Sequence, residues 1–176
     1  MEMDWLPEFE LTREEKHVYF LREAYKYASI NVNDLSTKLG AVIVGSRNMP
    51  LSYGANGLPD FLEDIPERHE RPLKYDYVRH AERNSITNAA KRGVSVKNAT
   101  MYCPWYACPP CAIEISDSGI AKVVGHYEMF MRTPDKWKEP VARGFGILHE
   151  KGVNTLLYTG RIGGVTALMN GQVWNP

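Results

Sequence analysis

Two short motifs bring together residue types that commonly bind metal ions. One is His80-Ala81-Glu82, and the other is Cys108-Pro109-Pro110-Cys111. Two cysteines separated by two residues can bind one metal ion, and His80 would add a nitrogen ligand. Two Cys and one His make three protein ligands for Zn²⁺, whereas a structural zinc site normally has four, so one position would stay open for water. Because zinc lowers the pKa of bound water from about 15.7 to roughly 7, this ligand set predicts a catalytic zinc centre.

Glu82 lies two residues after His80 and need not bind the metal itself. A carboxylate beside the metal can take a proton from the bound water and pass it to a substrate. The combined pattern, His-x-Glu followed by Pro-Cys-x-x-Cys, is the signature of zinc-dependent nucleobase deaminases. Ala107 stands where that signature has proline, a position that shapes the turn and supplies no ligand. The departure therefore leaves the predicted chemistry intact.

A Cys-x-x-Cys pair by itself also occurs in redox sites and in structural zinc sites. The redox alternative leaves His80-Ala81-Glu82 unexplained. A structural zinc would need a fourth ligand, which Cys103 could supply, although a cysteine in a strand is more often a small buried hydrophobic residue. A second, structural zinc that used His69 or His126 is disfavoured because the chain has only three cysteines.

The elements that must position these motifs alternate between helices and strands. Thr12 and Glu15 form a capping-box pattern at the start of a helix predicted over residues 12–28. Both motifs fall at predicted helix starts, where the helix dipole lowers the pKa of a thiol. We predict further helices over 80–92, 111–118 and 135–151, and strands over 39–45, 49–55, 99–104, 120–125 and 153–159. This order predicts an α/β fold, one sheet with helices packed on its faces.

Two segments show no regular pattern. Residues 56–79 form a long excursion punctuated by prolines, in which we expect a helical turn near 60–65. Loops this long inside a domain are usually functional or disordered. Residues 160–176 are rich in glycine, and we expect an irregular tail there.

Charge and composition limit the classes of function. The 176 residues include 21 basic and 21 acidic side chains, and the resulting net charge of zero argues against a nucleic-acid partner. The acidic N-terminus lacks the apolar core of a signal peptide, and no apolar stretch approaches the ~18 residues of a membrane span. The odd, tightly grouped cysteines indicate metal chemistry in a reducing compartment. We therefore expect a cytoplasmic protein that does not bind membranes.

Several stretches resemble, in the same order, the deoxycytidylate (dCMP) deaminase family of the cytidine deaminase-like superfamily. Residues 38–44 look like the family's first core strand, and residues 53–59 are similar to its Gly-Tyr-Asn-Gly-x-Pro substrate loop, with Ala55 in place of the tyrosine. Residues 80–86 resemble the start of the catalytic helix. Residues 100–112 and 118–120 resemble the metal-binding strand and helix. The resemblance covers about residues 12–125 and is looser over the last fifty.

The resemblance implies one deaminase domain over residues 1–176, with its catalytic core at about 12–160. Its fold would be αβα, a five-stranded mixed sheet with helices on both faces. It implies one catalytic zinc ion per chain, held by His80, Cys108 and Cys111, with Glu82 as the proton shuttle. Asn56 would hydrogen-bond the sugar or the base edge of the substrate. The family also implies a homo-oligomer and regulation by nucleoside triphosphates.

Three other residues are candidates for substrate contacts. Lys38 precedes the apolar strand and could contact a phosphate or simply end a strand in solvent. Trp105 and Tyr106 precede the zinc cysteines and could wall a base pocket or belong to the core.

Together these features predict hydrolytic deamination of a small-molecule substrate, a free cytosine nucleotide. The expected reaction converts dCMP to dUMP and releases ammonia, which makes the protein a hydrolase that acts on a cyclic amidine C–N bond. The alternatives are a deaminase of another nucleobase, of a nucleoside or of tRNA adenosine, and a non-catalytic zinc-binding module. The neutral charge weighs against a polynucleotide substrate, and Glu82 weighs against a purely structural zinc.

Overall fold

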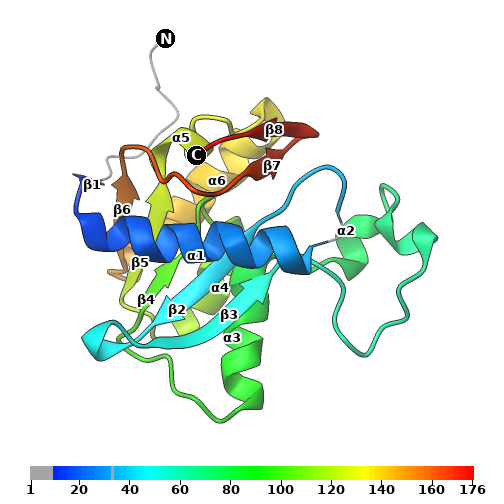
Figure 1. Cartoon of the computed structure of the whole chain (residues 1–176). Helices are drawn as coiled ribbons and strands as arrows, with labels where there is room; N and C mark the ends of the chain where they lie inside the picture. Colours follow the sequence, from blue (N-terminus) through cyan, green and yellow to red (C-terminus); the bar gives the residue numbers. More distant parts are fainter. Residues whose placement is uncertain (1–9, 33) are drawn as a thin grey trace.

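The computed structural model describes residues 10–32 and 34–176. Its main sheet has six strands in the order β1-β6-β5-β4-β2-β3 (Figure 1). The strands are β1 (Glu10–Thr12), β2 (Gly40–Val44), β3 (Pro50–Ala55), β4 (Thr100–Tyr102), β5 (Lys122–His126) and β6 (Asn154–Tyr158). Strands β1, β6, β5 and β4 run parallel, whereas β2 is antiparallel to both β4 and β3. The sheet is therefore mixed, as predicted.

The prediction of five strands was too low by one because β1 adds to the outer edge of β6. Residues 10–12 are only three residues long, and such a segment carries too little alternation to predict a strand. Thr12 belongs to β1, and its hydroxyl accepts a hydrogen bond of 3.3 Å from the backbone N–H of Glu14. Helix α1 (Glu15–Asn31) therefore starts three residues later than predicted, and the expected capping box at Thr12 was wrong.

Helices cover both faces of the sheet. Helix α1 crosses one face, and α3 (Ala81–Lys91), α4 (Pro109–Asp117) and α6 (Asp135–Glu150) cover the other (Figure 1). Strand β3 shows both contacts, because the Tyr53 ring packs 5.2 Å from that of Tyr27 on α1, whereas Gly54 faces α3. A Cβ at Gly54 would lie 2.3 Å from the carbonyl oxygen of Ala81, so only glycine allows α3 to lie so close to the sheet.

Strand β2, which lies between β4 and β3, is buried over its whole length. Its sequence, Gly-Ala-Val-Ile-Val, has no polar side chain, as expected of a strand covered on both faces. The strand predicted over residues 49–55 is confirmed as β3, which pairs with β2 after the short 3-10 turn η1 (Ser46–Asn48).

The long excursion contains two short helical turns, η2 (Pro66–His69) and α2 (Lys74–Tyr77). The turn predicted near residues 60–65 is therefore misplaced, since helical structure begins at Pro66, a residue suited to a first helical turn. Helix α5 (Tyr127–Phe130) is a further short turn directly after β5.

The predicted irregular tail was also wrong in part. Strands β7 (Ala167–Met169) and β8 (Gln172–Trp174) form an antiparallel hairpin. Asn170 and Gly171 both have positive φ, 52° and 75°, as a two-residue type I′ turn requires. Asn-Gly between two short apolar segments is a strong hairpin signal that the sequence interpretation passed over. Trp174 of this hairpin stacks on His126 of β5, with ring centroids 5.9 Å apart.

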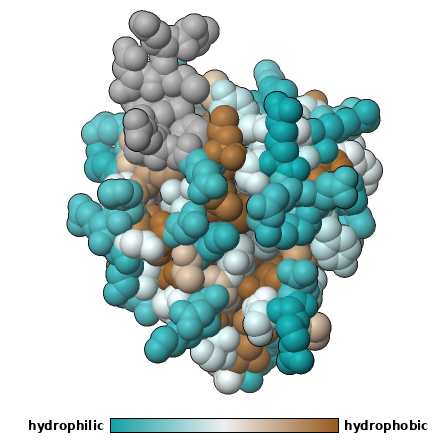
Figure 2. Space-filling model, turned by 90° about the vertical axis from the view of Figure 1, so that its left-hand side faces the viewer, coloured by the Kyte–Doolittle hydropathy of each residue, from teal (hydrophilic) through white to brown (hydrophobic). Residues whose placement is uncertain are grey.

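The face of the molecule on the side of β1 carries hydrophilic side chains interspersed with smaller hydrophobic areas (Figure 2). Within the described part of the chain, no helix is both long enough and apolar enough to cross a membrane.

Candidate functional site

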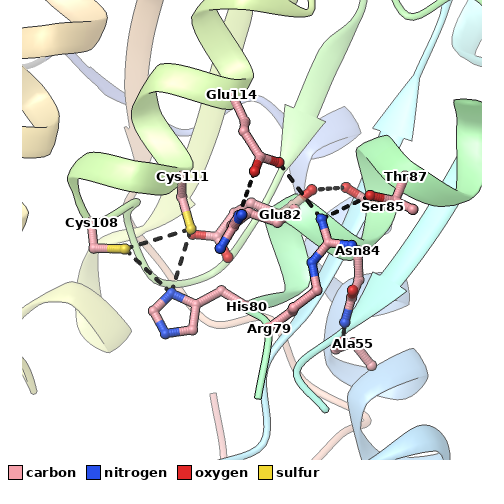
Figure 3. A network of polar contacts seen from close by, with 11 residues as sticks. Ala55, Arg79, His80, Glu82, Asn84, Ser85, Thr87, Cys108, Cys111 and Glu114 are labelled. Carbon is pink, nitrogen blue, oxygen red and sulfur yellow. Dashed lines mark hydrogen bonds and ion pairs between the residues drawn. The ribbon is translucent and has the colours of Figure 1, made fainter. Parts of the chain in front are cut away.

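The two metal-binding motifs lie at the starts of neighbouring helices, as predicted (Figure 3). His80 is the N-cap of α3, and Glu82 lies in the first turn of that helix. Cys108 is the N-cap of α4, whose first two positions are prolines. Proline suits a helix start because its missing N–H would have no partner there. Cys111 follows in the same turn, so both thiols and the imidazole project from helix N-termini.

The three ligand atoms form a compact triangle. The Nδ1 atom of His80 lies 3.4 Å from Cys108 Sγ and 3.4 Å from Cys111 Sγ, and the two sulfur atoms lie 3.5 Å apart. Tetrahedral zinc with Zn–S and Zn–N distances of about 2.3 and 2.0 Å would separate its ligand atoms by roughly 3.5–3.8 Å. The residues therefore fit a zinc ion that has three protein ligands and one open position.

Cys103 does not join this triangle. Its thiol is buried and donates a hydrogen bond of 3.2 Å to the carbonyl oxygen of Trp105. Among the described residues, one group of side chains is arranged to hold a metal ion, His80 with Cys108 and Cys111. The geometry thus favours an open three-ligand site over a closed four-ligand structural one.

The electrostatics of the site favour one thiolate and a protonatable carboxyl. A hydrogen bond from Cys111 and, against the effect of burial, one from His80 lower the pKa of Cys108 to about 4. The Glu82 side chain is buried, and its loss of hydration raises the pKa of the carboxyl although the nearby His80 opposes this. A carboxyl whose pKa is raised can both accept and donate a proton near neutral pH.

A cavity of about 100 Å³ opens at His80. It adjoins a larger, more open cavity of about 710 Å³, with which it shares Asp34, Ser36, Arg71 and Lys74. The edge of the Trp137 ring faces both His80 and Trp105, with ring centroids 6.2 and 5.9 Å away. The cavity thus has an aromatic wall beside the candidate metal ligands and basic side chains farther out.

Two of the predicted substrate contacts line this cavity. Trp105 is one of them, and its indole N–H donates a hydrogen bond of 2.9 Å to the hydroxyl of Thr133. Asn56 is the other, and its amide bridges two backbone groups, the N–H of Leu39 at 2.7 Å and the carbonyl of Thr37 at 3.0 Å. Asn56 therefore also holds the start of β2.

The other two predicted contacts lie elsewhere. Tyr106 is buried in the core, where its ring stacks on Phe145 at 4.3 Å and its hydroxyl donates to the carbonyl of Leu156. The expectation that Tyr106 walls the pocket was therefore wrong, because the chain turns after Trp105 and directs the second aromatic side chain inward. Lys38 lines a separate cavity together with residues of α1 and β7.

Residues that the sequence interpretation missed complete the cavity. Trp137 and Lys136 come from the first turn of α6, and Arg71 and Lys74 come from the excursion. Acidic residues alternate with Arg71 and Lys74 along the chain, a pattern that is more typical of a solvated face than of a binding site. No local sequence signal separates Trp137 from an ordinary core aromatic residue.

The family described as "Cytidine and deoxycytidylate deaminase zinc-binding region" matches residues 14–127, which include all three candidate ligands and Glu82. The chain belongs to this family. Family membership together with the fitting ligand triangle makes zinc the metal of this site.

Two curated relatives are similar to this member of the family. The deoxycytidylate deaminase of Homo sapiens is 36% identical over 112 residues, which cover 60% of this chain and 61% of that protein. The deoxycytidylate deaminase of enterobacteria phage T2 is 41% identical over 121 residues, 69% of this chain and 63% of that protein. The matched part of this chain thus spans about three fifths of the length of these relatives.

A solved structure shares the fold. The dCMP deaminase of cyanophage S-TIM5, determined in complex with dCMP and dUMP, aligns with a TM-score of 0.63 over 82% of this chain and 97% of its own. The sequences are 23% identical. This likeness confirms the cytidine deaminase-like α/β fold.

Proposed function

We propose that this protein is a zinc-dependent hydrolytic deaminase that converts dCMP to dUMP and releases ammonia. The observation that carries the proposal is the buried Glu82 carboxyl at an open three-ligand metal site. A structural zinc would not need this carboxyl, whereas hydrolytic deamination needs a group that moves protons. The names of the human and phage relatives, and the nucleotides bound to the cyanophage protein, support the choice of dCMP.

In this proposal different residues bind the metal and transfer protons. His80, Cys108 and Cys111 would hold zinc, which when bound supplies a Lewis acid that makes water acidic at neutral pH. Glu82 would accept a proton from the attacking water and deliver it to N3 of the cytosine ring. It would then carry a second proton to the departing amino group. One water is consumed, the C4–N bond breaks, and one ammonia leaves for each uracil nucleotide formed.

We place the base in the cavity at His80, against Trp105 and Trp137, with Asn56 at its rim. Arg71 and Lys136 line the same cavity and are better placed than Lys38 to hold a 5′-phosphate, whereas Lys74 in this cavity is ion-paired with Asp34. A phosphate needs one or two cationic or backbone donors, which a chain with zero net charge can provide locally.

We propose further that residues 1–176 form one deaminase domain in a homo-oligomer under nucleoside triphosphate control. The three unpaired cysteines, two of them in the metal cluster, support a reducing, cytoplasmic setting. Light scattering tests for the oligomer, and rate measurements with added triphosphates test for regulation.

The decisive experiment is one panel of ammonia-release assays on the zinc-loaded protein. The substrates are dCMP, CMP, deoxycytidine, cytosine, guanine and adenosine-containing RNA. We expect the highest kcat/KM with dCMP. A preference for guanine or for RNA would replace the proposal with a purine or tRNA deaminase, and no release from any substrate would favour a non-catalytic zinc protein.

A further inference from the structure

An ion-pair network joins the two helices that carry the candidate zinc ligands. Arg83 on α3 donates a hydrogen bond of 2.6 Å from Nε to the Oε1 atom of Glu114 on α4. The other carboxylate oxygen of Glu114 lies 3.8 Å from a guanidinium nitrogen of Arg79, the residue before His80 (Figure 3). One carboxylate from α4 is thus shared by two arginines at the start of α3.

The network lies one helical turn from the zinc ligands. Arg83 follows His80 by three residues, and Glu114 follows Cys111 by three. Residues three apart on a helix are neighbours on the same face. The faces of α3 and α4 that carry the ligands are therefore the faces that the ion pair holds together.

Arg79 extends the network to the loop that contains Asn56. Its guanidinium donates a hydrogen bond of 2.9 Å to the hydroxyl of Thr87, farther along α3. Its backbone pairs in both directions with Gly57, at 3.0 and 2.9 Å. Asn84 of α3 adds a hydrogen bond of 2.8 Å to the carbonyl of Ala55. Helix α3 is thus fixed to both α4 and the substrate loop.

The network is poorly suited to a general role in folding. The side chains of Arg79, Glu114 and Arg83 are 26%, 32% and 36% exposed. Ion pairs with this much solvent contact contribute little to global stability. They can nevertheless set the spacing of two helix starts, and that spacing decides whether three ligand atoms meet at one metal ion.

We infer that Glu114, held between Arg79 and Arg83, is a positioning residue that keeps α3 and α4 at the separation needed to retain zinc. The inference rests on the proposed function only in that the site must bind zinc. Loss of a side chain that hydrogen-bonds a metal ligand typically changes metal affinity by roughly 10–100-fold. We expect Glu114 to act at the lower end of this range, since it contacts no ligand atom.

The test measures zinc transfer from the loaded protein to an excess of a coloured chelator. Glu114→Gln keeps the size of the side chain and removes its charge, and we expect zinc to be lost about tenfold faster. The double variant Arg83→Gln/Glu114→Gln should lose zinc no faster than Glu114→Gln, because both changes break the same pair. Glu139→Gln is the matched control, since it breaks an exposed ion pair with Arg143 within α6.

Thermal unfolding of the metal-free variants distinguishes an effect on the zinc site from a general loss of folding stability. We expect the same melting temperature for wild type, Glu114→Gln and Glu139→Gln. Zinc retention by Glu114→Gln within twofold of wild type would overturn the inference, as would equal zinc loss from Glu139→Gln. If Glu114→Gln does not fold, Arg83→Gln breaks the same ion pair from α3. Zinc retention by Arg83→Gln within twofold of wild type would then overturn the inference. A wild-type protein that binds no zinc would instead refute the proposed function.

Discussion

Each candidate zinc ligand is supplied by the first turn of a helix, where backbone N–H groups lack helical partners and the dipole favours negative charge. This setting stabilises thiolates. Within the pair, the hydrogen bond with Cys111 lowers the pKa of Cys108, whereas the same contact and burial raise the pKa of Cys111. Glu82 shares the helix start with His80 but is buried, so its carboxyl has lost the hydration that would keep it charged. At the scale of single residues, three ligand atoms cluster at the helix starts, and a buried carboxyl outside the ligand set lies near them.

Removal of a thiol should remove the metal. We expect the wild-type protein to hold close to one zinc per chain, and Cys108→Ala or Cys111→Ala to hold almost none. Because metal binding is coupled to folding, both variants should also melt at a lower temperature. Metal analysis of the purified proteins and thermal unfolding measure these effects. Cys103→Ala is the control, because Cys103 lies outside the ligand cluster and should leave the zinc content unchanged.

Glu82→Gln should keep zinc bound and abolish most ammonia release. Glutamine keeps the shape of the side chain but cannot carry protons, and positioned acid–base catalysis contributes about 10²–10⁴-fold. Because one carboxyl serves two proton transfers, we expect a loss at the upper end of this range or beyond. Zinc content should stay at the wild-type level. Ammonia release within tenfold of wild type would remove Glu82 from the mechanism.

At the scale of elements, close backbone packing holds the metal-binding helices in place. Helix α6 crosses α4 at Gly144, where a Cβ would lie 2.0 Å from the carbonyl oxygen of Ala107, directly before Cys108. On α3, Ser85 contributes its backbone carbonyl, which accepts a hydrogen bond of 2.8 Å from the Ser52 hydroxyl of β3. The helix starts are therefore fixed by neighbours on two sides.

Two glycines of α6 make a matched pair. Gly144→Ala should destabilise the protein by about 1–3 kcal/mol, since the new methyl group must displace backbone. It should also weaken zinc retention, because the displaced backbone leads into Cys108. Gly146 has open space where a Cβ would lie, so Gly146→Ala should stabilise the helix by about 0.5–1 kcal/mol. Denaturant unfolding measures both, and equal effects from the two changes would contradict the packing argument.

Over the whole molecule the basic and acidic side chains balance in number, but they are not evenly distributed. Lysine and arginine together equal aspartate and glutamate in number, yet several basic residues gather around the cavity at His80. Away from this cavity, two histidines are buried within the fold. His17 hydrogen-bonds the Tyr102 hydroxyl at 3.1 Å, and His126 hydrogen-bonds that of Tyr25 at 2.8 Å.

These buried histidines predict that the free energy of unfolding decreases in acid. Burial lowers the pKa of both His17 and His126 in the folded state, below the ordinary value of 6.5. Their contribution to stability is complete above pH 6.5 and is lost as the pH falls toward the folded-state pKa values, because the unfolded chain then binds protons that the folded chain does not. Urea unfolding at about pH 7.5 and about pH 5.5, on either side of the ordinary histidine pKa, should show a lower free energy of unfolding at the lower pH. In His17→Gln the difference between the two pH values should be smaller. An unchanged pH dependence in His17→Gln would contradict the assignment.

The basic residues at the cavity predict a requirement for the 5′-phosphate. Binding energy remote from the ring can orient C4 for reaction, so we expect deoxycytidine to have at least a ~100-fold lower kcat/KM than dCMP, equivalent to about 2.7 kcal/mol. Lys136→Ala should lower kcat/KM for dCMP and leave kcat/KM for deoxycytidine unchanged, so the ratio between the two should fall. Lys38→Ala is the control, because Lys38 lines a different cavity. Comparable kcat/KM values for the nucleoside and its monophosphate would point to a nucleoside deaminase.

Features that depend on residue type and short spacing can be predicted from the amino-acid sequence. His80 and the Cys-x-x-Cys pair indicate the metal, since metal binding depends on residue type and short spacing, and the role of Glu82 in proton transfer stays a prediction. The strands predicted over 39–45 and 49–55 are β2 and β3. The helices predicted over 80–92, 111–118 and 135–151 are each followed by a glycine with positive φ, namely Gly93, Gly119 and Gly152. The Asn170-Gly171 turn was equally local and could have been predicted.

Contacts between residues that are distant in sequence depend on how the chain folds. Tyr106 and Trp105 are adjacent in sequence, yet one enters the core and the other lines the cavity, because the turn after β4 directs them apart. Trp137 and Lys74 line the cavity at His80 from separate segments, and β1 joins the sheet through its pairing with β6. Such contacts depend on how helices and strands pack across the sheet, and a linear pattern of residues does not contain that information.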